Sequence, residues 1–339
     1  MVKILSPITS FEAACQVIDG GVDEVYCGVE VPGINYTGLS TRPSWCSLPT
    51  YDELGRVVSY AHKHSVQVAV TTEFPFMAEL IEKDIRRHIR ACVEKGIDAL
   101  IATDIGVILM VKNILHLNIP IYASTYLAPI NYEVVDLLRQ IGAKRVMLER
   151  HLTIDEIGEI VRHNKDIEIE AFVHGPGCSN INVNCYCCGS PIDLDPKFYK
   201  PEISVETLCQ TDYEIYKVDG RDKTKIADLP ILDAFSWCSL CQLPELLDTG
   251  IMGLKIVGRE CDQKYQGEIA RTYRELVDLL ECGQTEDFKK KLESVKNSDY
   301  FSEACMKKRC YYSSLFHTPY RVPIPPKWSM DNNEDLNSH

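Results

Sequence analysis

Cysteines in the C-terminal half of the chain have the residue type and number that a metal or iron–sulfur centre needs. Cys178 and Cys185 follow the strand-like run IEIEAFVHG, and Cys209 and Cys238 come further along the chain. Thiolates bind zinc in closed tetrahedral sites and iron in clusters. The C-x-x-C pairs that begin at Cys185 and Cys238 also fit the spacing of a zinc ribbon. The residues alone therefore leave zinc and iron open.

Polar side chains stand at the ends of most apolar, strand-like runs. In a barrel of parallel strands, the carboxyl ends of the strands carry the chemistry. His174 could there move protons near neutral pH or bind a metal, while Arg and Lys would suit a carboxylated ligand. The simpler alternative is a hydrogen-bonded structural histidine, with charges that are solvated or paired across the rim. The candidate set is Glu73, Asp104, Thr125, Glu149, Arg150, His174, Lys255 and Arg259.

Eight short, apolar runs recur along the chain with helical stretches between them. Each has about the length of a strand, and most are apolar enough to be buried on both faces, as parallel strands are. Eight alternating units predict an α/β fold, a (β/α)8 TIM-like barrel, rather than a doubly wound sheet. The runs are VKILSPI, DEVYCGV, VQVAVTTEF, DALIATD, IPIYAST, KRVMLE, IEIEAFVHG and GLKIVGR.

Helix signals fill the segments between these runs. Ser10 could cap a helix that ends at Gly20-Gly21, and residues 79 to 95 have amphipathic spacing. The sequences TYDE, from Thr50, and TIDE, from Thr153, both fit a capping box, in which a side chain and the backbone satisfy each other's free donors.

One connection is far longer than the others. About eighty residues separate His174 from the run GLKIVGR, and they contain the four cysteines and a hairpin signal at Asp219-Gly220. A long loop inside a compact domain is usually functional. The predicted division is a barrel over 1–283 with a cluster-binding insertion at 175–245, C-terminal helices over 284–318, and a Pro-rich, acidic tail over 319–339.

Composition narrows the class of protein. Hydrophobic residues make up 45% and charged residues 25%, which is ordinary for a globular protein. The net charge of −13 disfavours a nucleic-acid partner without excluding one. The N-terminus does not resemble an export signal, and no apolar stretch is long enough for a membrane span. Fifteen cysteines therefore suggest metal binding or redox work in a reducing cytoplasm rather than disulfides.

Several segments in order resemble the U-32 (collagenase-like) peptidase family over roughly residues 3 to 282. The N-terminal match is ILSPITSFEAACQVIDGGVDEVYCG, and IPIYASTYLAPIN and GAKRVMLERHLTIDEI follow it. The hallmark is EAFVHGPGC, and GLKIVGR precedes a helix that contains YRE. The chain departs from the hallmark at Pro176 and Gly177, where the family usually has a small and then an aliphatic residue, and Val183 replaces a Gly expected two positions before the second cysteine.

The resemblance implies an oxygen-independent hydroxylase with a [4Fe–4S] cluster and with prephenate as a possible oxygen donor. Members of this kind hydroxylate ubiquinone precursors or the C5 position of pyrimidines in RNA, and this chain is closer in size to the ubiquinone type. The implied cluster ligands are Cys178, Cys185, Cys209 and Cys238, although Cys187, Cys188 or Cys241 could replace one of them, and zinc is the alternative metal. The expected proton-transfer groups are His174, Glu73 and Glu149. The expected substrate-binding residues are Asp104, Thr125, Arg150, Lys255 and Arg259.

Other functions stay open at this point. The family name suggests a metal-dependent peptidase, but the chain contains neither an HExxH nor a GxSxG sequence. The chain could also be a non-catalytic, cluster-bearing subunit whose homologous partner chain binds the substrate, or it could form a homodimer. The substrate could be a small aromatic molecule, a nucleobase or a specialised metabolite.

Overall fold

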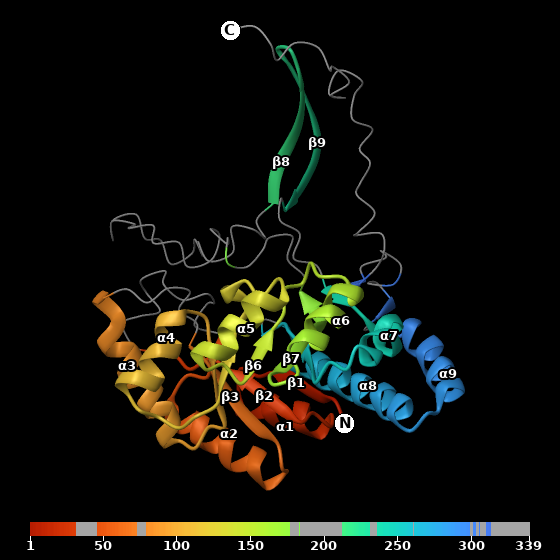
Figure 1. Cartoon of the computed structure of the whole chain (residues 1–339). Helices are drawn as coiled ribbons and strands as arrows, with labels where there is room; N and C mark the ends of the chain where they lie inside the picture. The colour runs from red at the N-terminus through yellow and green to blue at the C-terminus, as the bar shows by residue number, and fades with distance from the viewer. Residues whose placement is uncertain are drawn as a thin grey trace, which may run out of the picture.

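The computed structural model describes residues 1–31, 46–72, 79–176, 183, 212–230, 236–259, 261–298, 301–302, 305 and 310–312. Within these residues, parallel strands close into a barrel that is surrounded by helices (Figure 1). The barrel strands are β1 (Lys3–Pro7), β2 (Glu24–Cys27), β3 (Gln67–Thr71), β4 (Ala99–Ala102), β5 (Ile121–Ala123), β6 (Arg145–Met147), β7 (Glu168–Pro176) and β11 (Gly253–Ile256).

Strand pairing proves the closure. Each of the strands from β1 to β7 pairs in parallel with the next one, and β11 completes the ring between β7 and β1. All eight sequence runs become barrel strands, so the predicted TIM-like barrel is confirmed. The eighth strand follows the seventh only after the long, cysteine-bearing insertion, as expected.

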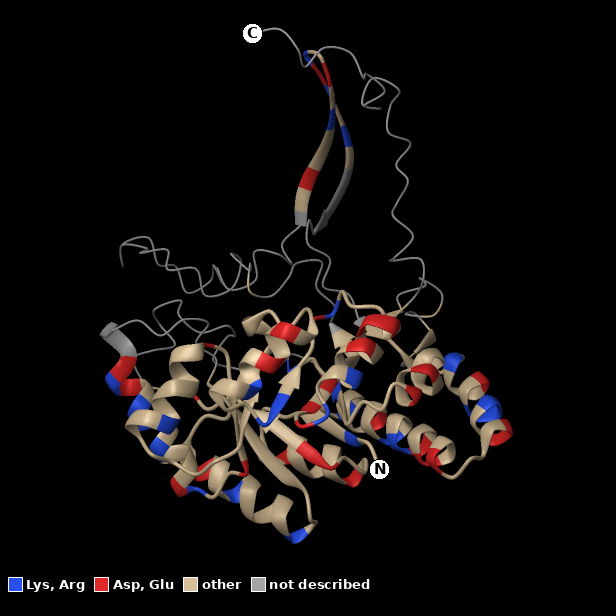
Figure 2. Ribbon diagram, viewed as in Figure 1, with Lys and Arg blue, Asp and Glu red and all other residues tan. Residues whose placement is uncertain are grey.

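Helices between the strands form the outer layer. Their bounds are α1 (Phe11–Asp19), α2 (Tyr51–Lys63), α3 (Glu79–Glu94), α4 (Ile105–Leu109), the π-helix η2 (Met110–Ile114), the 3-10 helix η3 (Thr125–Leu127), α5 (Tyr132–Ile141), α6 (Ile154–His163), α8 (Gln263–Glu281) and α9 (Thr285–Lys296). Acidic and basic side chains are interspersed on the outer faces of α8 and α9 (Figure 2). None of the helices that the structure describes is long and apolar enough to cross a bilayer.

The predicted helix caps are present, with one difference. Ser10 Oγ accepts from the backbone N–H of Ala13, and Thr153 with Glu156 forms a complete capping box. Thr50 caps α2, but the Glu53 carboxylate accepts from the backbone N–H of Phe11 instead of closing a box. Glu53 therefore ties α2 to the start of α1.

The described part of the insertion has two pieces. The first is a hairpin that projects away from the barrel in Figure 1, formed by β8 (Asp212–Asp219) and β9 (Asp222–Pro230). Gly220 takes φ +62 at its tip, as the sequence signal predicts. The second piece is β10 (Ser236–Cys238), the 3-10 helix η6 (Leu240–Gln242) and α7 (Leu243–Asp248). Because β10 pairs antiparallel with the end of β7, Cys238 lies opposite His174.

Candidate active site in the barrel

Alternate residues of each strand face two different cores. Ile4 and Val25 belong to the large core beneath the helices, whereas their neighbours Leu5 and Tyr26 belong to a second, small cluster. Inward-pointing side chains of a small barrel fill its interior in layers. The second cluster therefore forms the apolar filling of the barrel, and its members are Leu5, Tyr26, Ala69, Ala99, Ile101 and Tyr122.

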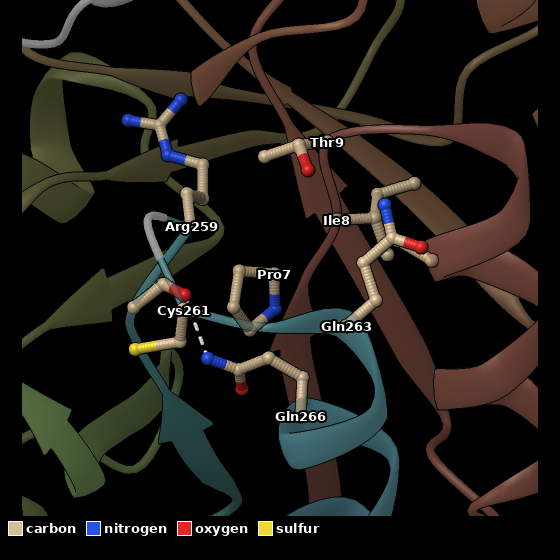
Figure 3. A pocket seen from close by; sticks show the side chains of 9 residues that line it. Pro7, Ile8, Thr9, Arg259, Cys261, Gln263 and Gln266 are labelled. Atoms are coloured by element: carbon tan, nitrogen blue, oxygen red, sulfur yellow. Dashed lines mark hydrogen bonds between the residues drawn. The ribbon is translucent and has the colours of Figure 1, made fainter. Parts of the chain in front are cut away.

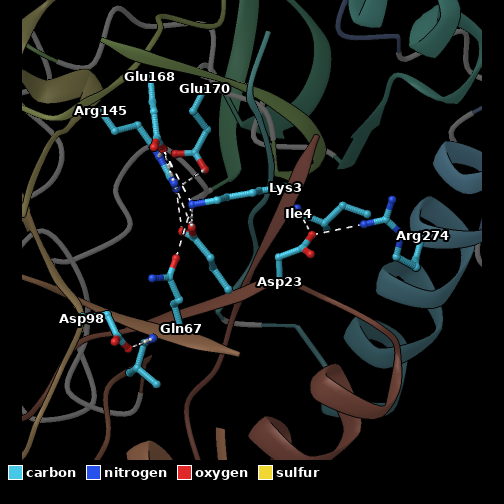
Figure 4. A network of polar contacts seen from close by, with 11 residues as sticks. Lys3, Ile4, Asp23, Gln67, Asp98, Arg145, Glu168, Glu170 and Arg274 are labelled. Carbon is cyan, nitrogen blue, oxygen red and sulfur yellow. Dashed lines mark hydrogen bonds and ion pairs between the residues drawn. The ribbon is translucent and has the colours of Figure 1, made fainter. Parts of the chain in front are cut away.

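A charged network fills the end of the barrel where the strands begin (Figure 4). At its centre, Arg145 donates two hydrogen bonds to Glu24, at 2.6 and 2.8 Å, and two to Glu168, at 2.8 and 2.6 Å. Lys3 Nζ lies 2.9 Å from a Glu24 oxygen. The Arg145 guanidinium also stacks on the ring of Tyr122, with its Cζ atom 4.1 Å from the ring centroid. Lys3, Glu24, Arg145 and Glu168 are the first residues of their strands. In a TIM barrel, the amino ends of the strands contribute to stability, whereas the chemistry lies at the carboxyl ends.

Burial and pairing oppose each other in this network. Burial pushes the pKa of Glu24 up, but the hydrogen bonds from Arg145 and Lys3 outweigh it and leave that pKa below its usual value. Glu24 is therefore ionised in the folded protein, and the network is an ion-pair scaffold. Sequence reasoning missed it, although charged residues inside otherwise apolar runs were the available signal.

Beyond the charged network, toward the carboxyl ends of the strands, lie two cationic side chains, Lys255 and Arg150, and the carboxyl group of Glu170. Lys255 Nζ is 4.3 Å from the centroid of the Tyr26 ring, and the Cζ atom of Arg150 is 3.9 Å from that of Phe172. Burial lowers the pKa of Lys255 and raises that of Glu170. Arg150 and Lys255 are thus close enough to influence each other electrostatically.

The remaining polar strand-end residues differ in their surroundings. Glu149 is buried, and its carboxylate accepts from the backbone N–H of Arg150 at 3.0 Å. Thr125 is also buried, and among the described residues its hydroxyl has no hydrogen-bond partner. Asp104 accepts from the backbone N–H of Gly106 and caps α4. The Asp104 carboxylate therefore has a structural role, and its substrate-binding role stays a prediction.

Arg259 lines a small hollow beside the start of α8 (Figure 3). In the figure its guanidinium points away from Gln266, and its Nη1 donates to the carbonyl of Cys46 at 3.4 Å. Gln266 Nε2 donates to the carbonyl of Gly258 at 2.6 Å, which fixes the turn after β11. Thr9 reaches the same hollow from the end of β1. Arg259 thus lies where the first and last barrel strands meet.

His174 lies in an aromatic cage formed by α8 and the C-terminal segment. Its Nε2 is 3.2 Å from the hydroxyl of Tyr265, its Nδ1 is 3.5 Å from that of Tyr273, and Phe301 meets the ring edge-on at 5.2 Å. Burial lowers its pKa to about 3, so the ring is uncharged at neutral pH. None of these contacts comes from Glu149, and the proton-transfer role of His174 stays a prediction.

Cys238 is buried beside the same cage. Its Sγ accepts from the backbone N–H of Leu240 at 3.5 Å and from the hydroxyl of Tyr273 at 3.9 Å. Burial raises the pKa of this thiol to about 12. A bound metal would have to displace the proton, since the thiolate is the ligand form. The N–H and O–H donors around the sulfur would suit such a thiolate.

Three further cysteines gather around Cys238. Cys310 pairs with it through an isolated β-bridge, and the thiols of Cys241 and Cys305 both perturb its titration. No sequence pattern connects Cys305 and Cys310 with Cys238, because both lie in the C-terminal segment. In the described part of the chain, no three His, Cys, Asp or Glu side chains are already placed to hold a metal ion.

Four of the predicted site residues lie outside the described residues: Glu73, Cys178, Cys185 and Cys209. The structure brings Glu149, Arg150 and Lys255 to the carboxyl half of the barrel, and it places His174 and Cys238 together on the side of α8. Sequence reasoning missed Glu170, Tyr265 and Tyr273. Glu170 opens the hallmark EAFVHGPGC and Tyr273 opens the sequence YRE, so both stood in segments already singled out, whereas no motif marks Tyr265.

Comparison with known families decides the relationship. The family model described as peptidase family U32 matches residues 9–311. The chain belongs to this family. The match begins just after β1 and extends over the other seven barrel strands and the insertion, and it includes His174, Cys238 and Lys255.

The relatives of this U32 protein carry names of two kinds, protease and RNA hydroxylation protein. A protein named uncharacterized protease, from Methanocaldococcus jannaschii, is 26% identical over 88% of the chain. The tRNA hydroxylation protein P1 of Bacillus subtilis is 24% identical over 84%, and the 23S rRNA 5-hydroxycytidine C2501 synthase of Escherichia coli is 26% identical over 82%. The chain spans 72%, 65% and 39% of the lengths of these three relatives.

Solved structures add little. A U32 peptidase structure aligns with 76% of this chain and 93% of its own, at 13% identity and a TM-score of 0.47. Thiamine phosphate pyrophosphorylase from Pyrococcus furiosus covers 80% of this chain and 94% of its own, at 10% identity and a TM-score of 0.43. The description of the fold therefore rests on the strand pairing.

Proposed function

We propose that this U32 protein is an iron–sulfur-dependent hydroxylase that works without dioxygen, and that a nucleobase of RNA is its substrate. The observation that carries the proposal is the similarity, over more than four-fifths of the chain, to relatives named for hydroxylation of tRNA and of 23S rRNA. The net charge of −13 requires that any RNA be held by local contacts rather than by the overall field.

Cys238 fits a role as a cluster ligand. It is buried, its sulfur accepts hydrogen bonds from a backbone N–H and a hydroxyl, and its strand pairs with β7, which ends two residues before Cys178. Cys178, Cys185 and Cys209 would complete the set. When bound, a [4Fe–4S] cluster supplies one-electron chemistry at a potential that nearby hydrogen bonds tune.

The tyrosines of α8 would keep Cys238 and His174 in place. Tyr273 donates to the carbonyl of Val173 at 2.6 Å and also reaches the Cys238 sulfur, so one side chain ties β7 to β10. Tyr265 contacts the other nitrogen of the His174 ring. These contacts orient an uncharged imidazole and exclude water from its surroundings.

The carboxyl half of the barrel would hold an anionic co-substrate, for which prephenate is our candidate. The Arg150 guanidinium lies over the ring of Phe172, and its planar donor set suits a carboxylate. Lys255 adds a nitrogen nearby. Glu170, whose pKa is raised by burial, and Glu149 would hold or transfer protons beside the ligand.

Nucleoside analysis tests the proposal. Wild type, C238A and C282A would be expressed anaerobically in a strain that lacks its own RNA hydroxylases, and nucleosides from tRNA and rRNA would be examined by mass spectrometry. Cys282 is an exposed cysteine at the end of α8, so C282A is the matched control. Wild type and C282A are expected to add one oxygen to a pyrimidine, and C238A is not. Full hydroxylation by C238A would contradict a role for the cluster. If wild type added no oxygen to any nucleoside, an RNA substrate would be contradicted.

A peptidase is the second candidate, because other relatives carry that name. The collagenase of Porphyromonas gingivalis is 24% identical over 84% of the chain. Cleavage of gelatin by wild type, at a rate that chelators abolish and that C238A does not share, would favour this reading. Intact gelatin after long incubation with active hydroxylase would exclude it.

A further inference from the structure

Lys255 stands inside the barrel with its side chain buried. It is the third residue of β11, its Cα is in register with Leu5 on one side and with Phe172 on the other, and it is 7% exposed. Its nitrogen lies over the inward-facing ring of Tyr26, 4.3 Å from the centroid. The amine therefore faces the interior of the barrel, in the half where the strands end.

Among the described residues, no acceptor forms a hydrogen bond with the Lys255 nitrogen. Lys255 Nζ makes neither a hydrogen bond nor an ion pair within the part of the chain that the structure describes, and the face of Tyr26 is its one close polar contact there. An ammonium has three N–H donors, and burying it without acceptors is costly. The neutral amine loses much less on burial, so this environment favours the form with a free lone pair.

The charges around Lys255 act in the same direction. Burial is the main cause that lowers its pKa, and the guanidinium groups of Arg145 and Arg150 lower it further, whereas Glu170 and Glu24 oppose them. Glu170 raises the pKa of Lys255 only weakly, because burial raises the pKa of Glu170 itself and favours its neutral acid. Glu24 is already paired with Arg145 by two hydrogen bonds. A lysine that is desolvated and close to other cations is activated as a nucleophile.

Arg150 provides the second half of a binding site. Its guanidinium stacks on Phe172, the residue in register with Lys255, at 3.9 Å. A ligand with a carboxylate on Arg150 would thus present its neighbouring atom to the amine. The ligand chemistry that fits both groups is a small 2-oxo acid, in which a carbonyl carbon is bonded directly to a carboxylate.

We infer that Lys255 condenses with the carbonyl group of a small 2-oxo acid whose carboxylate is bound by Arg150. The lone pair of Nζ attacks the carbonyl carbon and forms a C–N bond. The carbonyl oxygen takes up two protons, one of them from the nitrogen and one from the Glu170 carboxylic acid, and leaves as water when the C–O bond breaks. The product is a protonated imine beside the Glu170 carboxylate. No electrons are gained or lost. The step deepens the proposed function, because it uses the residues assigned above to prephenate, which itself contains a 2-oxo acid group, but its test does not require hydroxylation.

Borohydride trapping with pyruvate tests this inference. Purified wild type would be incubated with pyruvate, reduced with sodium borohydride, and examined by intact mass and peptide mapping. Hydride adds to the imine carbon and makes the adduct permanent. We expect one reduced pyruvate per chain, located on Lys255, and none on K255M. An exposed lysine provides the control, so K291M is expected to be labelled like wild type.

The dependence of labelling on pyruvate and on pH gives two further readouts. R150M is expected to need a pyruvate concentration about tenfold or more higher for half-maximal labelling, because a charge-assisted contact is lost. Labelling of wild type should persist at a pH well below the pKa of an exposed lysine. Adducts spread over surface lysines, or no adduct on Lys255 of folded wild type, would overturn the inference. Since the mapping is done on wild type, misfolding of a variant cannot obscure the result, and a failed RNA assay would leave it standing.

Discussion

Replacing Arg145 by Met tests the ion-pair scaffold at the amino end of the barrel. The substitution keeps an apolar stem but removes the cation that binds Glu24 and Glu168 and that lies 3.7 Å from Glu170. Glu24 and Glu170 are 1% and 2% exposed, so both carboxyl groups would stay buried after losing this partner, and Glu24 would keep Lys3 Nζ at 2.9 Å. Removing one partner of a buried ion pair costs about 3–5 kcal/mol. For a chain of this size, that loss lowers Tm by about 4 to 7 °C.

The dependence on pH gives the prediction its sign. In wild type the pKa of Glu24 lies below its unfolded value, so its contribution is present above that value and is lost as the pH falls. In R145M burial would raise the pKa of Glu24 instead, so stability would fall as the pH rises through the acid range. The deficit of R145M is therefore expected to be larger at pH 8 than at pH 5, and adding E24Q should recover part of it.

Urea unfolding followed by circular dichroism would measure these differences. Arg139 is the matched control, because it pairs with Asp136 on the exposed face of α5. R139M is expected to cost less than about 1 kcal/mol, as exposed ion pairs do. If R145M lost no more stability than R139M, the reasoning about buried charge would be refuted.

Three further predictions concern two buried histidines, a glycine with no room for a side chain, and a buried tyrosine. His174 and His88 have pKa values lowered by burial to about 3 and about 4, so stability should decline as the pH falls below 6.5, and NMR titration of either ring near pH 6.5 would contradict this. G175A should be severely destabilised, because the φ of Gly175 is +109 and a Cβ would lie 2.2 Å from the carbonyl oxygen of Val257. The control G220A, at a residue with φ +62 and open space around it, should lose only about 1–2 kcal/mol. Equal decreases in Tm for the two variants would argue against the clash. Y273F should lose roughly 0.5–1.5 kcal/mol, because the hydrogen bond from the Tyr273 hydroxyl is removed while the hydroxyl and the backbone N–H of Ser239 still donate to the Val173 carbonyl, and a Tm equal to that of wild type would show that the bond is unimportant.

Much of the fold could be predicted from local patterns. Runs that are apolar on both faces, with cap signals such as Ser10 and Thr153 between them, specify alternating strands and helices, and eight units close into a barrel. These signals act over a few residues, which is why the sequence alone sufficed. The hairpin at Gly220 is local in the same sense.

The interior network was beyond such reasoning, because its contacts are not local. Glu24 and Arg145 are 121 positions apart, and nothing near either residue indicates its partner. The gathering of Cys305 and Cys310 around Cys238 is of the same kind, since it depends on where the C-terminal segment returns to β10.

The surroundings of His174 depend on a local irregularity. Alternation along β7 would give Phe172 and His174 the same environment. The pairing with β11 shifts between Lys255 and Ile256, where the partner changes from Phe172 to His174. An irregularity of this type redirects a side chain and leaves no signature in one sequence. His174 accordingly contacts α8, whereas the ring of Phe172 contacts the guanidinium of Arg150.

Metal analysis of anaerobically purified protein tests the central claim most directly. Iron, sulfide and zinc would be measured together with the visible spectrum for wild type, C238A and C282A. The account predicts a broad band near ~410 nm with roughly four iron and four sulfide per chain in wild type and C282A, and their loss in C238A. A colourless wild type with one zinc per chain, or a cluster that survives in C238A, would contradict it.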